Sequence, residues 1–176
     1  MDKSTTIKDI ILPADITSLL KTLKDAGYQG YLVGGCIRDI LMHKSPKDWD
    51  ITTNANPEQI QALFPDSFYE NDFGTVGVKT ETGVIEVTPF RKEGIYSDGR
   101  RPDSVEYSDS IEIDLSRRDF SINAIAYDPL DDKLVDPYDG IRDIKDKLIK
   151  CVGDANKRFS EDGLRIMRMI LSLIHI

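Results

Sequence analysis

Two aspartates separated by one residue, Asp48 and Asp50, are spaced in a way that could support metal chemistry. Polar and apolar residues alternate over 47–52, which predicts a strand, and residues two apart on a strand point to one face. Two converging carboxylates repel each other unless a cation lies between them. Mg²⁺ suits this role because it typically takes one or two carboxylates together with substrate phosphates. The pair predicts a magnesium site, although an isolated Asp-x-Asp is also common on solvated strands.

A glycine turn precedes this pair in the chain. Residues 28–33 predict a short apolar strand, Gly34 and Gly35 follow it, and residues 36–42 predict a helix. Backbone N–H groups at such a turn can approach a phosphate closely, and Arg38 adds further donors. A plain glycine turn with Arg38 on a solvated face explains this segment alone equally well. The dinucleotide-binding fingerprint is excluded because its third glycine is missing.

Glu86 is the one acidic residue of an otherwise apolar strand predicted over 84–90. It is either an edge residue that faces water or the third acid of a metal site. Enzymes that clamp the attacking and leaving oxygens between two metal ions need about this many acidic ligands. Beside Asp48 and Asp50, the interpretation as a third acid is favoured.

Four segments resemble, in order, the motifs of class II tRNA nucleotidyltransferases and bacterial poly(A) polymerases. The resemblance covers the chain from about residue 13 to residue 170. It implies an α/β (α+β) fold: a polymerase-β-like nucleotidyltransferase head over 1–150, with a mixed sheet flanked by helices, and the start of a helical neck over 151–170. The segments are 33–39 with 48–50, then 117–124, then 136–140, and finally 158–168.

The resemblance also implies a role for individual residues. The catalytic carboxylates would be Asp48, Asp50 and Glu86, and the first two would hold Mg²⁺. The incoming nucleotide would be bound at the glycine turn and by the second and fourth motifs, with base selection by the fourth. The implied nucleotide-binding residues are Gly34, Gly35, Arg38, Arg118, Asp119, Asp162, Arg165 and Arg168.

Base selection by Asp162 and Arg165 has a physical rationale of its own. Cytosine and adenine present an amino donor beside a ring-nitrogen acceptor, whereas guanine and uracil present a carbonyl acceptor beside an N–H donor. A carboxylate only accepts and a guanidinium only donates. The two residues, three apart on one predicted helix face, would therefore accept C and A and reject G and U. The alternative is a surface ion pair of little energetic value.

A long loop predicted over 91–104 bears on the activity within this family. Residues 92–104 occupy the position of the flexible loop of the CCA-adding branch, which CC-adding relatives have shortened. Residues 70–77 lack the more basic character of the corresponding stretch in poly(A) polymerases. We therefore predict addition of C, C and A to the 3′ end of tRNA from CTP and ATP. The alternatives are an A-adding enzyme, a poly(A) polymerase and a catalytically silent nucleotide-binding fragment.

The composition restricts the classes of protein to which the chain can belong. With 40% hydrophobic and 31% charged residues the chain is typical of a globular protein. No apolar run reaches the roughly 18 residues of a membrane span, the first six residues lack the apolar core of a secretory signal, and Cys36 and Cys151 have no metal or disulfide spacing. These features predict a cytoplasmic protein without a membrane partner.

The formal net charge of −8 is unexpected for an enzyme that binds RNA, because phosphate contacts normally need Lys and Arg. Either the acids concentrate at a metal site and on solvated faces, or RNA is held mainly by a part outside this chain. The second explanation agrees with the C-terminal residues. The family pattern expects an arginine at Leu171, and residues 171–176 match the translation of a sequencing-library adaptor. We expect these six residues to be non-native.

Apolar periodicity predicts the remaining elements. Alternating helices and strands place the chain in the α/β or α+β class. Helices are predicted over 13–27, 57–64, 116–126 and 140–148, with a last one beginning near Phe159, and further strands over 74–79 and 84–90.

Overall fold

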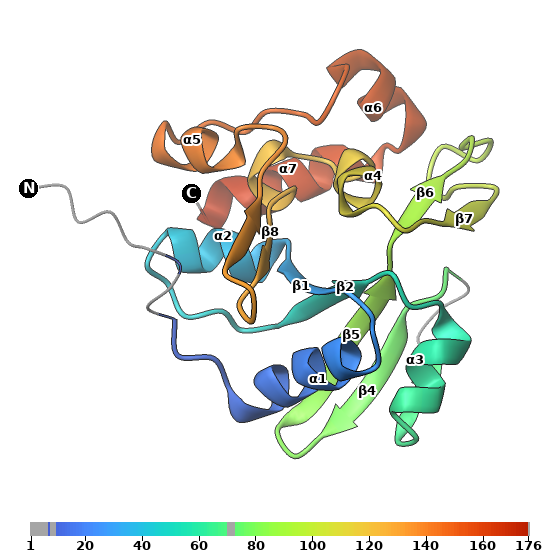
Figure 1. Cartoon of the computed structure of the whole chain (residues 1–176). Coiled ribbons are helices and arrows are strands. Elements are labelled where there is room, and N and C mark those ends of the chain that lie inside the picture. The colour runs from blue at the N-terminus through green and yellow to red at the C-terminus, as the bar shows by residue number, and fades with distance from the viewer. Residues whose placement is uncertain (1–6, 8–9, 70–72, 176) are drawn as a thin grey trace, which may run out of the picture.

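The computed structural model describes residue 7, residues 10–69 and residues 73–175 (Figure 1). Three segments interpreted above fall wholly or partly outside the described residues. They are the N-terminal residues 1–6, residues 70–72 of the stretch compared with poly(A) polymerases, and Ile176. In the described part of the chain, none of the helices has the length and apolar character needed to cross a membrane.

Helices and strands alternate along the chain, as predicted, and the short β6–β7 hairpin projects from one side (Figure 1). In chain order the elements are α1 (Ala14–Asp25), β1 (Gly30–Val33), α2 (Gly35–Leu41), β2 (Asp50–Thr53), α3 (Pro57–Leu63), β3 (Ser67–Tyr69), β4 (Val76–Thr80), β5 (Gly83–Pro89), β6 (Arg91–Glu93), β7 (Val105–Tyr107), α4 (Ile111–Ser116), the 3₁₀ helix η2 (Ser121–Asn123), β8 (Ala126–Asp128), β9 (Lys133–Val135), α5 (Gly140–Lys145), α6 (Ala155–Glu161) and α7 (Leu164–His175).

Seven of the strands form one mixed sheet in the order β3-β4-β5-β2-β1-β8-β9. The β2–β5 pair is parallel, whereas the other pairs in this sheet are antiparallel. Helices flank the sheet on both faces: α1, α2, α3 and α5 contribute apolar residues to the packing on one face, and α4 contributes to the packing on the other. The predicted class, a mixed sheet flanked by helices, is confirmed.

The two faces of the sheet pack against two separate apolar clusters. Leu32 and Ile51 belong to the larger cluster, which also contains the buried face of α1. Tyr31 and Val33, the neighbours of Leu32 on β1, belong to the second cluster, with Leu115 of α4. Successive strand residues point to opposite faces, so β1 is buried on both sides and lies at the centre of the molecule.

Local sequence explains where several helices begin and end. The apolar residues of α1 recur at helical spacing and are buried, and the chain leaves this helix at Gly27, which has φ +86°. Helix α3 begins with a capping box: Asn56 Oδ1 accepts from Gln59 N at 2.8 Å, and Gln59 Oε1 accepts from Asn56 N at 2.8 Å. Pro57 follows at the first helical position, as predicted.

The helix predicted over 116–126 is wrong. The chain is helical earlier, in α4, and then passes through a bridge at Phe120, the 3₁₀ helix η2 and the strand β8. Residues 124–126 are fully buried, because Ala126 pairs with Val33 at the centre of the sheet. A run buried on all sides has no periodicity that distinguishes a strand from a helix.

Candidate active site

The turn between β1 and α2 allows two charged side chains to approach the backbone closely. Gly34 has φ +78° and ψ −131°, a conformation that a residue with a side chain adopts only under strain. A Cβ atom here would lie 3.2 Å from Arg118 Nη1 and 3.7 Å from Asp50 Oδ2. Glycine at this position is therefore needed both for the backbone and for the approach of Arg118 and Asp50.

The catalytic carboxylates predicted from the sequence lie where β2 and β5 run side by side. Asp50 is the first residue of β2 and is in parallel register with Glu86 of β5, so these two side chains share a face of the sheet. Asp48 precedes the strand and is exposed. The strand predicted over 47–52 is thus wrong at its start, because β2 begins only at Asp50 and residues 47–49 pair with neither neighbouring strand.

Asp50 is electrostatically strained. Burial raises the pKa of its carboxyl, the positive charge of Arg118 lowers it, and the negative charge of Asp48 raises it again, with a net upward shift. A cation beside the two aspartates would relieve this strain, so the donor set fits a divalent ion that takes its other ligands from phosphates and water. Within the described residues, no group of three or more His, Cys, Asp or Glu side chains could hold a metal ion. Glu86 as a third acid therefore stays a prediction.

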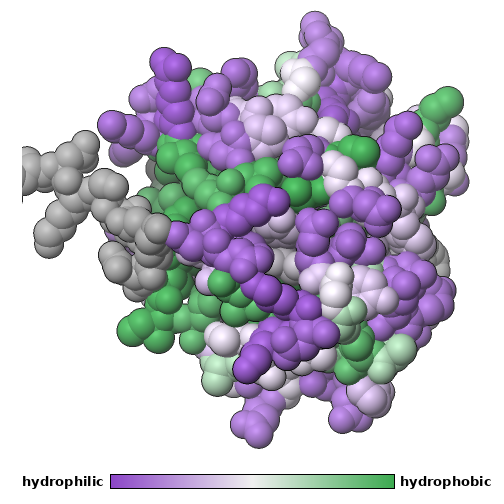
Figure 2. Space-filling model, viewed as in Figure 1, coloured by the Kyte–Doolittle hydropathy of each residue, from purple (hydrophilic) through white to green (hydrophobic). Residues whose placement is uncertain are grey.

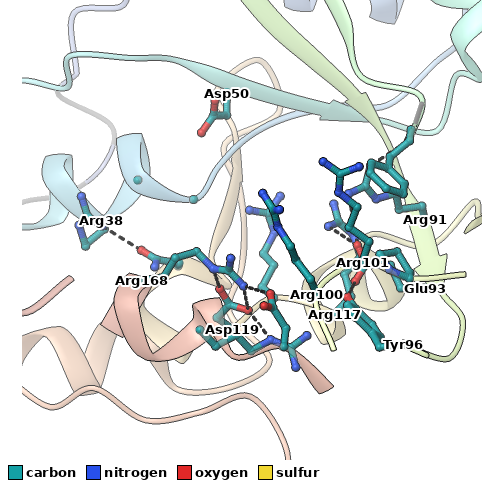
Figure 3. Close-up of a pocket in the computed structure, with 18 residues that line it drawn as sticks. Arg38, Asp50, Arg91, Glu93, Tyr96, Arg100, Arg101, Arg117, Asp119 and Arg168 are labelled. Carbon is teal, nitrogen blue, oxygen red and sulfur yellow. Dashed lines mark hydrogen bonds and ion pairs between the residues drawn. The ribbon is translucent and has the colours of Figure 1, made fainter. Parts of the chain in front are cut away.

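An arginine-rich cavity of about 420 Å³ opens beside Asp50. Its lining contains eight arginines and four carboxylates, a net charge of +4 on a chain whose total is −8. Figure 3 shows Asp50 on the opposite side of this cavity from Asp119 and Arg168. Its charged lining residues are Arg38, Asp50, Arg91, Glu93, Arg100, Arg101, Arg117, Arg118, Asp119, Asp162, Arg165 and Arg168.

The predicted site residues converge on this part of the molecule. Nine of them line the arginine-rich cavity, namely Gly34, Gly35, Arg38, Asp50, Arg118, Asp119, Asp162, Arg165 and Arg168. Asp48 and Glu86 instead line a neighbouring cavity of about 500 Å³, together with Trp49 and, again, Asp50. Asp50 is thus the predicted site residue at which the two cavities meet.

The segment predicted to select the base is not one continuous helix, which corrects the expectation that Asp162 and Arg165 share a helix face. Helix α6 ends at Glu161, Asp162 has extended backbone with φ −145° and ψ 107°, and α7 begins at Leu164. Asp162 Oδ1 accepts from the Leu164 N–H at 2.8 Å. Asp162 therefore accepts a hydrogen bond from the first residue of α7 and also lines the arginine-rich cavity.

Asp119 holds both arginines of this segment. Its Oδ1 accepts from Arg165 Nε at 2.7 Å, and its Oδ2 accepts from Arg168 Nε. Arg165 is 2% exposed, pairs also with Glu161 at 2.8 Å, and lies 5.4 Å from the ring centroid of Tyr96. The other oxygen of Asp162 accepts from Arg168. The residues predicted to select the base thus form one network of ion pairs with Asp119 of the second motif.

Arg38 is held rather than solvated. It is 8% exposed, its Nε and Nη2 donate to Asp39 Oδ1 at 2.9 and 2.7 Å, and its Nη1 donates to Asn123 Oδ1 at 3.1 Å. These contacts contradict the alternative interpretation in which Arg38 lies on a solvated face. Asn123, at the end of η2, is a lining residue that the sequence patterns did not identify.

Sequence reasoning missed a second set of lining residues, carried by the β6–β7 hairpin. The loop between these strands supplies two exposed arginines, and its base supplies Arg91 and Glu93. The adjacent Arg100 and Arg101 were the sequence feature that could have indicated this part of the cavity. Two adjacent charges alone, however, do not show whether their side chains point into a cavity or into solvent. The residues concerned are Arg91, Glu93, Tyr96, Arg100 and Arg101.

A mixed sheet brings acidic residues to a glycine turn beside an arginine-rich cavity, an arrangement suited to a ligand that carries phosphate groups. Residues 30–150 match the family model described as the poly(A) polymerase head domain, and the chain belongs to this family.

Curated relatives are CCA-adding enzymes. The enzyme of Lactobacillus helveticus is 43% identical over 171 residues, covering 97% of this chain and 42% of that protein. The enzyme of Bacillus licheniformis is 44% identical over 165 residues, covering 93% of this chain and 41% of that protein. The chain therefore spans about two fifths of the length of these relatives.

Solved structures agree with the sequence relatives. The CCA-adding enzyme of Bacillus stearothermophilus in complex with CTP superposes with a TM-score of 0.79 at 37% identity, covering 90% of this chain and 39% of that one. The Thermotoga maritima CCA-adding enzyme complexed with tRNA superposes with a TM-score of 0.70 at 27% identity, covering 97% of this chain and 40% of that one.

Proposed function

We propose that this chain is the catalytic head of an enzyme that adds C, C and A to the 3′ end of tRNA from CTP and ATP. The observation that carries the proposal is the position of Asp50 between two cavities. A nucleoside triphosphate in the arginine-rich cavity and an RNA 3′-hydroxyl in the neighbouring cavity would meet at this carboxylate. Transfer would join the 3′-oxygen to the α-phosphorus and release pyrophosphate.

Similarity to known proteins supports this proposal. Its curated relatives are CCA-adding enzymes at 43–46% identity, and structural neighbours contain CTP or tRNA. The loop between β6 and β7, which CC-adding relatives have shortened, is also present, and this favours CCA or A addition over CC addition. In this proposal residues 1–150 form the catalytic head and 151–170 begin a helical neck, and the protein acts in the cytoplasm.

The residues of the arginine-rich cavity would mainly position and neutralise the triphosphate. Phosphoryl transfer needs little covalent chemistry from the protein, so catalysis depends on placement and charge. Arg38 and Arg118 would donate to phosphate oxygens, and Gly34 and Gly35 would let the phosphates approach the backbone. Mg²⁺ held by Asp48 and Asp50 would supply charge neutralisation and activation of the 3′-hydroxyl.

Asp162 and Arg165, with Arg168 beside them, would select the base. A carboxylate accepts from the amino group of C or A, and a guanidinium donates to the ring nitrogen. In the structure these groups are paired with Asp119 and with each other. A bound base would therefore replace part of this ion network, and a base without the matching pattern would leave buried charges unpaired.

The test is incorporation by this chain with Mg²⁺, a tRNA lacking its CCA end, and each nucleoside triphosphate singly and in combination. Incorporation of C followed by a single A is expected. A-only extension of a CC-ended tRNA would indicate an A-adding enzyme, and long A tracts on any RNA would indicate a poly(A) polymerase. Binding of CTP without any incorporation would favour a nucleotide-binding module.

The loop arginines give a separate prediction about charge. The guanidinium groups of Arg100 and Arg101 line the cavity and are exposed, so replacing both with serine should leave the fold intact. Loss of two charge-assisted contacts should weaken CTP binding by about tenfold or more, as measured by calorimetry.

The matched control removes the same charge elsewhere. Arg142 and Lys145 lie exposed on α5, away from both cavities. Replacing both with serine should leave CTP affinity unchanged. Equal weakening in the two double variants would mean that only overall charge matters, and that the loop arginines do not contact the nucleotide.

A further inference from the structure

A buried carboxylate that belongs to none of the sequence motifs lies behind the arginine-rich cavity. Asp114 of α4 is 0% exposed. Its Oδ1 accepts from Arg117 Nε at 2.9 Å and lies 2.8 Å from Arg117 Nη2, and its Oδ2 accepts from Arg118 Nη2 at 3.2 Å. Burial alone would raise the pKa of Asp114, but the charges of Arg118 and Arg117 outweigh it and hold the pKa below its ordinary value. Asp114 is therefore a charged group with both oxygens engaged.

Arg118 depends on this carboxylate for its position. Its Nη1 lies 3.2 Å from the position that a Cβ at Gly34 would take, and its charge acts on Asp50. Within the described residues Arg118 Nε has no hydrogen-bond partner, and the ion pair found for its guanidinium is the one to Asp114. Asp114 thus fixes Nη2 of the guanidinium, while Nη1 lies beside the Gly34 turn that lines the cavity.

The second partner of Asp114 extends the same network to the base of the loop. Arg117 Nη1 donates to Glu93 Oε1 at 3.2 Å, and Glu93 also accepts from Arg91 Nη2 at 3.2 Å and from the Tyr96 hydroxyl. The two oxygens of one carboxylate therefore bind two adjacent arginines, of which Arg118 lies beside the glycine turn and Arg117 reaches the base of the hairpin.

We propose that Asp114 is a positioning residue that acts through Arg118, orienting its guanidinium over the Gly34 turn to bind the triphosphate. The proposal rests on the proposed function, because it assigns the arginine-rich cavity to a nucleoside triphosphate. A carboxylate is required because each of its oxygens faces an arginine donor. An asparagine would turn an amide N–H₂ toward one of them and lose that contact.

The test compares binding of inorganic tripolyphosphate and of CTP by calorimetry. Asp114→Asn should weaken binding of both ligands by about tenfold or more, because it removes the orientation of a charge-assisted contact. Arg118→Ala should weaken them at least as much. The variant carrying both changes should bind no more weakly than Arg118→Ala alone, because Asp114 acts only through Arg118. Losses that multiply, or an Asp114→Asn variant with wild-type affinity, would overturn the proposal.

A matched control distinguishes positioning of Arg118 by Asp114 from a purely structural role of Asp114. Asp143 is also a buried aspartate on a short neighbouring helix, where its Oδ2 accepts from the Ser121 hydroxyl at 2.5 Å, and it does not line the cavity. Asp143→Asn should keep wild-type affinity for tripolyphosphate even where its melting temperature falls. An equal loss of affinity in both variants would assign the effect to loosening of the fold and refute positioning by Asp114.

Charge balance provides a second route if Asp114→Asn alone does not fold. Asp114→Asn combined with Arg117→Gln removes one buried charge of each sign, and it is compared with Arg117→Gln alone. The double variant is expected to bind tripolyphosphate about tenfold more weakly than Arg117→Gln alone. Equal affinities of these two variants would overturn the proposal. Failure of the wild-type chain to bind tripolyphosphate and CTP would contradict the proposed function itself, whereas wild-type binding that is insensitive to Asp114 contradicts only the positioning role.

Discussion

Asp50→Asn is expected to abolish nucleotide incorporation, with a loss on the order of a thousandfold or more, while the fold stays intact. A metal-bound carboxylate at the reacting phosphate contributes several kcal/mol of charge stabilisation, and the neutral amide cannot replace it. The melting temperature should be unchanged or higher. Burial raises the pKa of Asp50 in the folded chain, so the folded state binds this proton more tightly than the unfolded state, and ionisation of Asp50 opposes folding.

The measurements are incorporation of labelled CTP and thermal unfolding as a function of pH. As pH rises from the ordinary carboxyl range through the raised pKa of Asp50, the wild-type chain should lose stability relative to Asp50→Asn, which has no charge to bury. Asp109→Asn, an exposed aspartate outside both cavities, is the matched control and should change neither property. Activity within tenfold of wild type in Asp50→Asn would refute the assignment of the metal site.

Gly140→Ala should produce the largest loss of stability among the substitutions considered. A Cβ atom at Gly140 would lie 2.2 Å from the Ser121 carbonyl oxygen and 2.8 Å from its carbonyl carbon. Both are backbone atoms that cannot rotate away, so α5 and η2 must separate, at an expected cost of about 3 kcal/mol. For a chain of this size the melting temperature should fall by roughly 10 °C, which calorimetry or circular dichroism can measure.

Gly163→Ala is the control for this prediction. A Cβ at Gly163 meets no heavy atom within 4 Å, so the same methyl group should cost less than about 1 kcal/mol. Equal stability of the two alanine variants would show that α5 is not packed on η2 as described.

Sequence patterns within one segment were sufficient to predict the elements whose boundaries depend on residues a few positions apart. Helix α1 follows from its apolar spacing, α3 follows from Pro57, and the turn at Gly34 follows from two glycines after an apolar run. These features depend on neighbours within a few positions in the chain. Residues of the first, second and fourth motifs also reached one cavity, whereas residues 136–140 of the third motif line neither cavity.

Contacts between distant segments account for the errors. The strand at Ala126 is set by its place beside Val33, a residue of a distant segment. Asp114 was not identified from the sequence, and the pairing of Arg165 with Asp119 was not foreseen, because this arginine–carboxylate contact joins different segments and forms only on folding. No spacing rule within one segment contains this information.

The charge distribution shapes how a polyanion approaches this molecule. Far from the protein, a nucleoside triphosphate experiences the field of the whole chain, whose net charge of −8 is repulsive. At close range it experiences the cavity, whose lining carries eight arginines against four carboxylates. Salt at about 0.1 M screens fields beyond roughly 10 Å and leaves closer contacts largely intact. Added salt should therefore speed the encounter before it weakens the bound state, and phosphate groups are drawn to the protein only where they can enter the cavity.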